Sequence, residues 1–351
     1  MATDQARIRV VTGYRPDVLT VLGFCFVALL VIWLGVNFVM NPADFYNLFL
    51  IGLTNGAVYG LVALGYSLVY GILELINFAH GDVFMLGGML VATMTSAWFA
   101  TATGAGLWAG ILLMLVITMA FCAALNTTIE LVAYRRLRNA PRLAPLITAI
   151  GISFILQNIG LKWKGARPTS VPDILPDGTV FTIAGVPYTW NKFIVILFTI
   201  PVLLLLMWLV QKTKQGKAMR ATAQDRDAAA MMGISVNRTI SFTFFIAGGL
   251  AGAAGLLYAL YFTNVRFDEG FRVGLIAFTA AVLGGIGSVT GAAIGGLILG
   301  VAESIGPVLL LTGIHVPATN QLRDVVAFTI LVLVLVFRPG GLLGTGEPDK
   351  A

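Results

Sequence analysis

The stretch Lys212–Asn237, KTKQGKAMRATAQDRDAAAMMGISVN, is a polar island in a chain that is otherwise strongly apolar. Its charged side chains cannot lie in hydrocarbon, so we predict that this polar segment lies outside a membrane. Between Ala218 and Met232 it contains neither Pro nor Gly, and Gly233 is a good C-terminal cap. These features predict one short surface helix over residues 218–232, ending at Gly233. It is either a connector between spans or a docking helix for a cytosolic partner.

The composition outside this segment indicates a membrane protein that crosses the bilayer many times. Apolar residues make up 58% of the chain, charged residues 11%, and the mean hydropathy is +0.92. Soluble domains carry about a quarter charged residues. The net charge of +6 would suggest nucleic acid in a soluble protein, but here it follows from cationic cytoplasmic loops. We therefore expect no nucleic-acid partner.

Ten apolar runs recur along the chain, and a helix needs about 20 residues to cross a bilayer. They lie near residues 18–40, 45–73, 83–101, 107–133, 143–161, 191–211, 239–262, 274–289, 291–312 and 321–337. We predict an all-α polytopic protein with about 8–10 transmembrane helices. The short run 274–289 meets 291–312 at a glycine-rich turn, so these two could form one broken or re-entrant hairpin. The run 45–73 is longer than needed and rich in glycine, so we expect it to tilt or unwind partway.

The distribution of Lys and Arg between alternate loops predicts the orientation. With the N-terminus inside, 15 of these residues fall on inside loops and 7 on outside loops. The positive-inside rule then places both termini and the polar segment in the cytoplasm. The longest outside loop, residues 162–190, is rich in proline.

The chain lacks the usual residue patterns of an enzyme. His80 and His315 have no other His or Cys at metal-ligand spacing, so a metal site is not expected. No GxxxxGK[ST] phosphate loop occurs, so the chain is not expected to hydrolyse ATP by that mechanism. We predict no enzymatic activity and no bound cofactor.

Polar residues within or beside the apolar runs are the candidates for a gate or a transport path, because such residues are costly in lipid. The densest group is Glu74, Asn77, His80 and Asp82. An alternative is that Gly81 ends one helix and Asp82 caps the next. Further candidates stand singly, where they could equally bridge two helices: Thr54, Asn55, Gln157, Asn158 and Glu303.

Several motifs resemble the permease subunits of branched-chain amino acid ABC importers, the high-affinity leucine/isoleucine/valine type, which implies a place in the bacterial inner membrane. They include Gly65–Ile72, GYSLVYGI, Ile76–Gly81, INFAHG, Glu130–Arg135, ELVAYR, Ser153–Asn158, SFILQN, Ala277–Ser288, AFTAAVLGGIGS, and Gly291–Glu303, GAAIGGLILGVAE. Together they cover roughly residues 47–344 in the same order as in the family.

The resemblance implies a type II ABC-importer-like permease domain over residues 41–344. Residues 1–40 then form a basic tail and an extra span, and residues 345–351 a cytoplasmic tail. It also implies a coupling helix over residues 216–233 that docks in a groove of the ATPase. The matching residues are Gly216, Arg220, Ala221, Asp225, Ala229 and Gly233.

The implied partners are a second related permease or another copy of this chain, two cytosolic ATPase subunits and a periplasmic substrate-binding protein. Urea and short-chain amide importers use similar permeases, so the cargo stays open at this point. A stand-alone secondary transporter or channel is the rival class. The scarcity of acidic residues within the apolar runs argues against it.

Overall fold

The structure is a computed structural model and describes residues 18–99, 104–138, 140–141, 143–183, 185–311, 319–338 and 340–344. The predicted tails, residues 1–17 and 345–351, lie outside these ranges, as does His315. The longer helices are α1 (Val18–Met40), α2 (Pro42–Leu73), α3 (Ala79–Met94), α4 (Ala105–Ile129), α6 (Leu143–Lys164), α7 (Trp190–Lys212), α10 (Val236–Phe262), α11 (Glu269–Gly284), α12 (Val289–Ile305) and α13 (Arg323–Phe337).

Each predicted apolar run coincides with one of these helices. Among the described residues, six helices are long and apolar enough to cross a membrane, which confirms a multi-pass membrane protein. The runs 274–289 and 291–312 are two separate helices, α11 and α12, joined by a turn at Gly285–Ser288. Helix α12 continues into a short π-helix, η3 (Gly306–Leu311).

The prediction that the second run could unwind was wrong. Helix α2 is continuous over 32 residues, and its glycines serve a different purpose. A Cβ atom at Gly56 would lie 2.7 Å from Leu297 Cα, and one at Gly300 would lie 2.3 Å from Gly56 N. The glycines therefore let the backbones of α2 and α12 touch directly.

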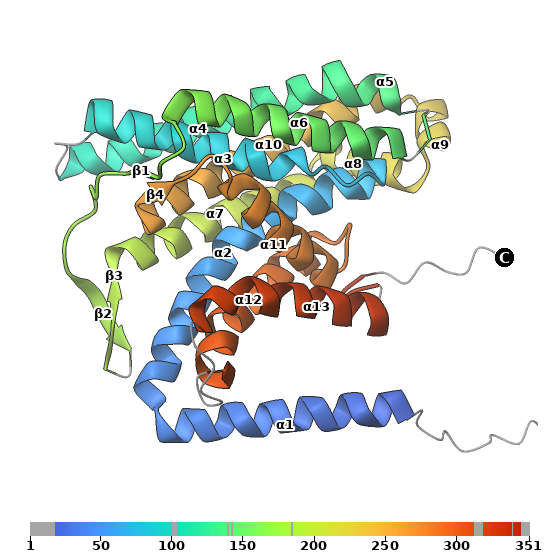
Figure 1. The fold of residues 1–351 in the computed structure, drawn as a ribbon. Helices are drawn as coiled ribbons and strands as arrows, with labels where there is room; N and C mark the ends of the chain where they lie inside the picture. The colour runs from blue at the N-terminus through green and yellow to red at the C-terminus, as the bar shows by residue number, and fades with distance from the viewer. Residues whose placement is uncertain are drawn as a thin grey trace, which may run out of the picture.

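The molecule has two distinct ends (Figure 1). At one end lie the strands β2 (Thr179–Ile183) and β3 (Val186–Thr189), which form an antiparallel hairpin within the predicted outside loop. Two smaller strands, β1 (Thr169–Ser170) and β4 (Asn264–Val265), pair nearby. At the opposite end lie α8 (Lys214–Gln224) and α9 (Arg226–Met231), which belong to the polar segment. Helix α1 begins and α13 ends at this second end.

Helix α10 lies at the centre of the bundle, where it packs on α2, α3 and α4. Helix α1 runs along the edge of the molecule, where it packs mainly on α2 and η3 (Figure 1). The Trp33 indole donates to the Leu309 carbonyl at 3.1 Å, and Phe38 meets Phe45 edge-on with ring centroids 5.3 Å apart. The extra span is thus held to the rest of the chain near one of its ends.

Candidate functional site

The polar segment forms two helices, so the prediction of a single helix over 216–233 was wrong. Asp225 adopts an extended conformation between α8 and α9, and its carboxylate accepts hydrogen bonds from the amides of Asp227 at 2.9 Å and Ala228 at 3.0 Å. Aspartate is a strong N-cap, and here it starts a second helix instead of continuing the first. The predicted end at Gly233 is confirmed, since its φ of +83° suits glycine.

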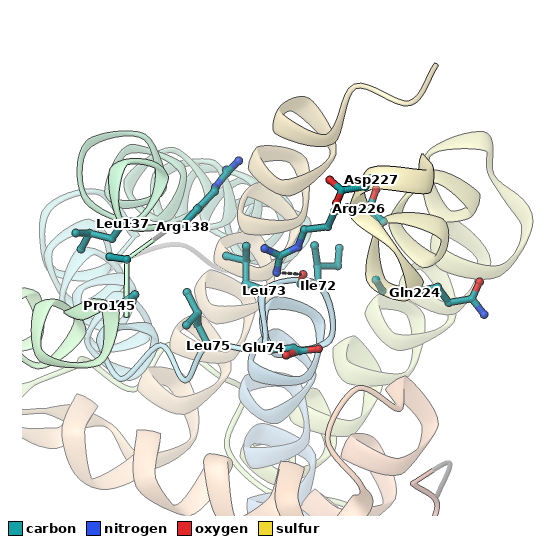
Figure 2. A pocket seen from close by; sticks show the side chains of 13 residues that line it. Ile72, Leu73, Glu74, Leu75, Leu137, Arg138, Pro145, Gln224, Arg226 and Asp227 are labelled. Atoms are coloured by element: carbon teal, nitrogen blue, oxygen red, sulfur yellow. Dashed lines mark hydrogen bonds between the residues drawn. The ribbon is translucent and has the colours of Figure 1, made fainter. Parts of the chain in front are cut away.

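Two arginines attach the polar segment to the ends of two membrane helices. Arg220 Nη1 donates to the Val210 carbonyl in the last turn of α7 at 3.0 Å, and Arg226 Nη2 donates to the Ile72 carbonyl in the last turn of α2 at 2.8 Å (Figure 2). Carbonyls in a last turn lack partners within their helix and carry its partial negative charge. Gly216 permits the close approach, because a Cβ there would lie 2.2 Å from the Val210 oxygen.

The apolar residues of the polar segment divide between an inner and an outer face. Ala229 is buried and Ala221 is half-buried, so both pack toward the chain itself. Met231 and Met232, in contrast, are 83% and 82% exposed. Large apolar side chains are rarely exposed at the end of a charged segment outside the lipid. This pair therefore suits a contact with another protein.

A cavity of about 450 Å³ separates the polar segment from the break between α2 and α3. Its lining combines Arg226 and Gln224 of the segment with Glu74 and Leu75 of the break (Figure 2). Arg138 contributes from the opposite side. The predicted gate residue Glu74 therefore lies beside the polar segment.

The break between α2 and α3 has an unusual backbone. Glu74 ends α2 in the left-handed region, with φ of 54°, and its amide donates to the Tyr70 carbonyl at 2.7 Å. Helix α3 then begins at Ala79, with Phe78 at the N-cap position. The alternative in which Gly81 ends one helix and Asp82 caps the next is therefore wrong. Both lie in the first turn of α3.

A polar cluster lies beyond the break, around a buried carboxylate. Glu130 is fully buried in the π-helix η2 (Glu130–Tyr134), where it forms ion pairs with Arg138 and, at 3.5 Å, with Arg135. Ser241 of α10 donates to its other oxygen at 2.6 Å. Burial lowers the pKa of Arg138 from its usual value and Glu130 opposes this, so the guanidinium stays charged at neutral pH.

The same π-helix touches the break through one hydrogen bond, in which the Tyr134 hydroxyl donates to Asn77 Oδ1 at 2.7 Å. Two motifs far apart in the sequence, INFAHG and ELVAYR, therefore meet at this end of the molecule. Arg138 and Ser241 were not among the predicted site residues. The only available signal was a Glu in an apolar run, which requires a cation nearby.

His80 and Asp82 are buried in α3 and do not face the cavity. The His80 ring meets Tyr66 edge-on with centroids 5.0 Å apart. Gly65 makes room for this ring, since a Cβ there would lie 2.2 Å from His80 Nε2. Gln157 is a polar neighbour of Asp82. The structure thus separates the side chains of this pair from the cavity beside Glu74.

The remaining candidates lie elsewhere, most of them toward the β2–β3 end. Asn55 Nδ2 donates to Ser304 Oγ at 3.4 Å, and the neighbouring Glu303 is buried near Tyr59 of α2, so both lie between α2 and α12. Thr54 donates to the Leu50 carbonyl at 2.9 Å within α2. Asn158 lies on the exposed face of α6 and bonds to the Phe154 carbonyl of its own helix. Their roles in a transport path stay predictions.

Comparison with known proteins agrees with this architecture. A family model described as "Branched-chain amino acid transport system / permease component" matches residues 48–335. The high-affinity branched-chain amino acid transport system permease protein BraD of Pseudomonas aeruginosa is 39% identical over 85% of this chain and 95% of its own length. The corresponding protein LivH of Escherichia coli K12 is 37% identical over the same shares. This chain therefore belongs to the family of branched-chain amino acid transport system permease components.

Proposed function

We propose that this chain is the membrane-spanning permease subunit of an ABC importer for branched-chain amino acids. The observation that carries the proposal is the 39% identity to BraD, which extends over 85% of the chain. Relatives named for branched-chain amino acids favour that cargo over urea or short-chain amides. The permease itself has no enzymatic activity and binds no cofactor. It forms the translocation path with a second permease, either a relative or another copy of itself.

Two cytosolic ATPase subunits supply the energy and dock on the polar segments of the two permeases. The exposed pair Met231 and Met232 supports this role, because an apolar tip on a charged helix fits a groove in a partner. The protein lies in the bacterial inner membrane with both termini and the α8–α9 end in the cytoplasm. A periplasmic binding protein delivers the amino acid at the β2–β3 end.

Docking is tested by co-purification in mild detergent, with the ATPases and this chain expressed together. We expect the ATPases to purify with the wild-type chain and to be lost when Met231 and Met232 are both changed to Asp. The matched control is Ile183→Asp, an exposed apolar residue at the opposite end. ATPases that stay bound to the double variant would contradict the docking role.

The cargo is tested separately, with the complete importer in liposomes. ATP-dependent uptake of radiolabelled leucine should be inhibited by excess isoleucine and valine but not by urea. Inhibition by urea or acetamide alone would assign this chain to the other type of importer.

A further inference from the structure

The α2–α3 break is held at both of its ends by contacts from distant parts of the chain. On the α2 side, Arg226 donates to the Ile72 carbonyl at 2.8 Å. On the α3 side, Tyr134 donates to Asn77 at 2.7 Å. Residues 74–77 between these contacts are not helical. The break is therefore a short, irregular link whose two ends are fixed separately.

The two contacts belong to different parts of the molecule. Arg226 begins α9 of the polar segment, whereas Tyr134 belongs to η2, which the Glu130 cluster ties to α10. A displacement of α8 and α9 relative to η2 that keeps both contacts must therefore change the distance between Ile72 and Asn77. The non-helical link can absorb this change through its backbone angles without breaking helix hydrogen bonds.

Arg220 makes a similar contact but cannot serve the same purpose. It reaches a carbonyl only 10 positions away, at the end of α7, and α7 leads directly into α8. Arg226 joins positions 154 apart in the sequence. Arg220 therefore stabilises a local turn between consecutive helices, whereas Arg226 connects the polar segment to the last turn of a helix that is distant in the sequence.

We propose that Arg226 is a positioning residue that transmits movement of the polar segment to the α2–α3 break, and that this break is the hinge of the cytoplasmic gate. The proposal rests on the proposed function, because the movement comes from the docked ATPases. Arginine suits the role, since its charged, planar fork donates firmly to a helix-terminal carbonyl. The cavity beside Glu74 leaves space in which the hinge can move.

The test measures ATPase binding, ATP hydrolysis and leucine uptake in the complete reconstituted importer. In Arg226→Gln we expect the ATPases to co-purify and to hydrolyse ATP within about two-fold of wild type. Uptake per ATP should fall about ten-fold, which corresponds to roughly 1.4 kcal/mol, the size of one hydrogen bond to a charged group. Arg226→Lys keeps a charged donor and should recover part of the loss. Arg238→Gln, an exposed arginine next to the polar segment, is the matched control.

A second variant keeps the proposal testable if Arg226→Gln does not insert into the membrane. Tyr134→Phe removes one hydroxyl at the other end of the hinge and should also lower uptake per ATP. Wild-type uptake per ATP in both variants would overturn the proposal, and so would loss of ATPase binding in Arg226→Gln, since the contact would then serve docking. Either result leaves the proposed function intact. Absence of the ATPases from wild-type preparations would overturn the proposed function itself and the hinge with it.

Discussion

Replacing Gly300 by alanine tests the direct backbone contact between α12 and α2. A Cβ at Gly300 would lie 2.3 Å from Gly56 N, 2.4 Å from Gly56 Cα and 2.6 Å from the Gly52 carbonyl oxygen. Carbon atoms pack at about 3.5–4.0 Å, so the two helices must move apart by roughly 1 Å. Because the obstructing atoms belong to the backbone, no change of side-chain rotamer relieves the clash.

The free-energy cost follows from the length of this contact. A radial gap of about 0.5–1 Å forfeits roughly a quarter to a half of the dispersion energy between facing atoms. Overpacking of a core typically costs about 1–3 kcal/mol, and a backbone clash between two long helices falls at the upper end. Alanine in place of helical glycine regains up to about 1 kcal/mol. We therefore expect a net destabilisation of about 2 kcal/mol.

The measurement is thermal unfolding of the purified protein in detergent, followed by the fluorescence of its six tryptophans. Gly300→Ala should lower the Tm by about 2–6 °C. Gly249→Ala is the matched control, because its Cβ would meet only Met119 Cε at 3.7 Å. Its Tm should stay unchanged or rise. A Tm for Gly300→Ala at or above that of the control would refute the backbone contact.

Three further substitutions test the site. Arg138→Gln should lower the free energy of unfolding by about 2 kcal/mol more than Arg136→Gln does, because it leaves the buried Glu130 without its main partner. Equal Tm values for the two variants would show that the Glu130 cluster does not stabilise the protein. Glu74→Gly should raise stability by about 0.5–1 kcal/mol, since glycine adopts a φ of 54° without strain, and a lower Tm would contradict this. Glu303→Gln keeps a hydrogen-bonding group of the same shape but removes the buried carboxyl group. It should slow leucine uptake at normal protein levels, and wild-type uptake would exclude Glu303 from the path.

The sequence predicts the helices of this protein well because the requirement for a membrane span is local. An apolar run of about 20 residues fixes its own secondary structure in a bilayer, whatever its neighbours are. Helix α1 covers the predicted run 18–40, and α2 ends with the predicted run at Leu73 but begins three residues earlier, at Pro42. The continuity of α2 was harder to predict, since glycines in a helix either loosen it or permit close packing. Only the position of α12 decides between these outcomes.

The candidate site was predicted only in part, because several of its contacts join residues that are far apart in the sequence. The N-cap at Asp225 has a local signal, because aspartate before an alanine-rich run favours a new helix. The contact between Arg226 and the Ile72 carbonyl has no local signal in the sequence, since the acceptor is a backbone atom that any residue supplies. For the same reason the motif around His80 indicated an important region without revealing that His80 and Glu74 lie in different environments.

Helix α2 makes two kinds of contact, one near each end, and together they explain how a small movement at one end of the molecule could act on the other end. Helix α2 holds 32 residues, a length of about 48 Å, without interruption. Near the β2–β3 end, its backbone lies directly on α12, beside the pair Asn55 and Ser304. At the other end, Arg226 holds its last turn. A rigid helix fixed in this way does not bend locally when its end is displaced. Helix α2 therefore carries α12 with it, so the buried polar residues around Glu303 would move together with the polar segment.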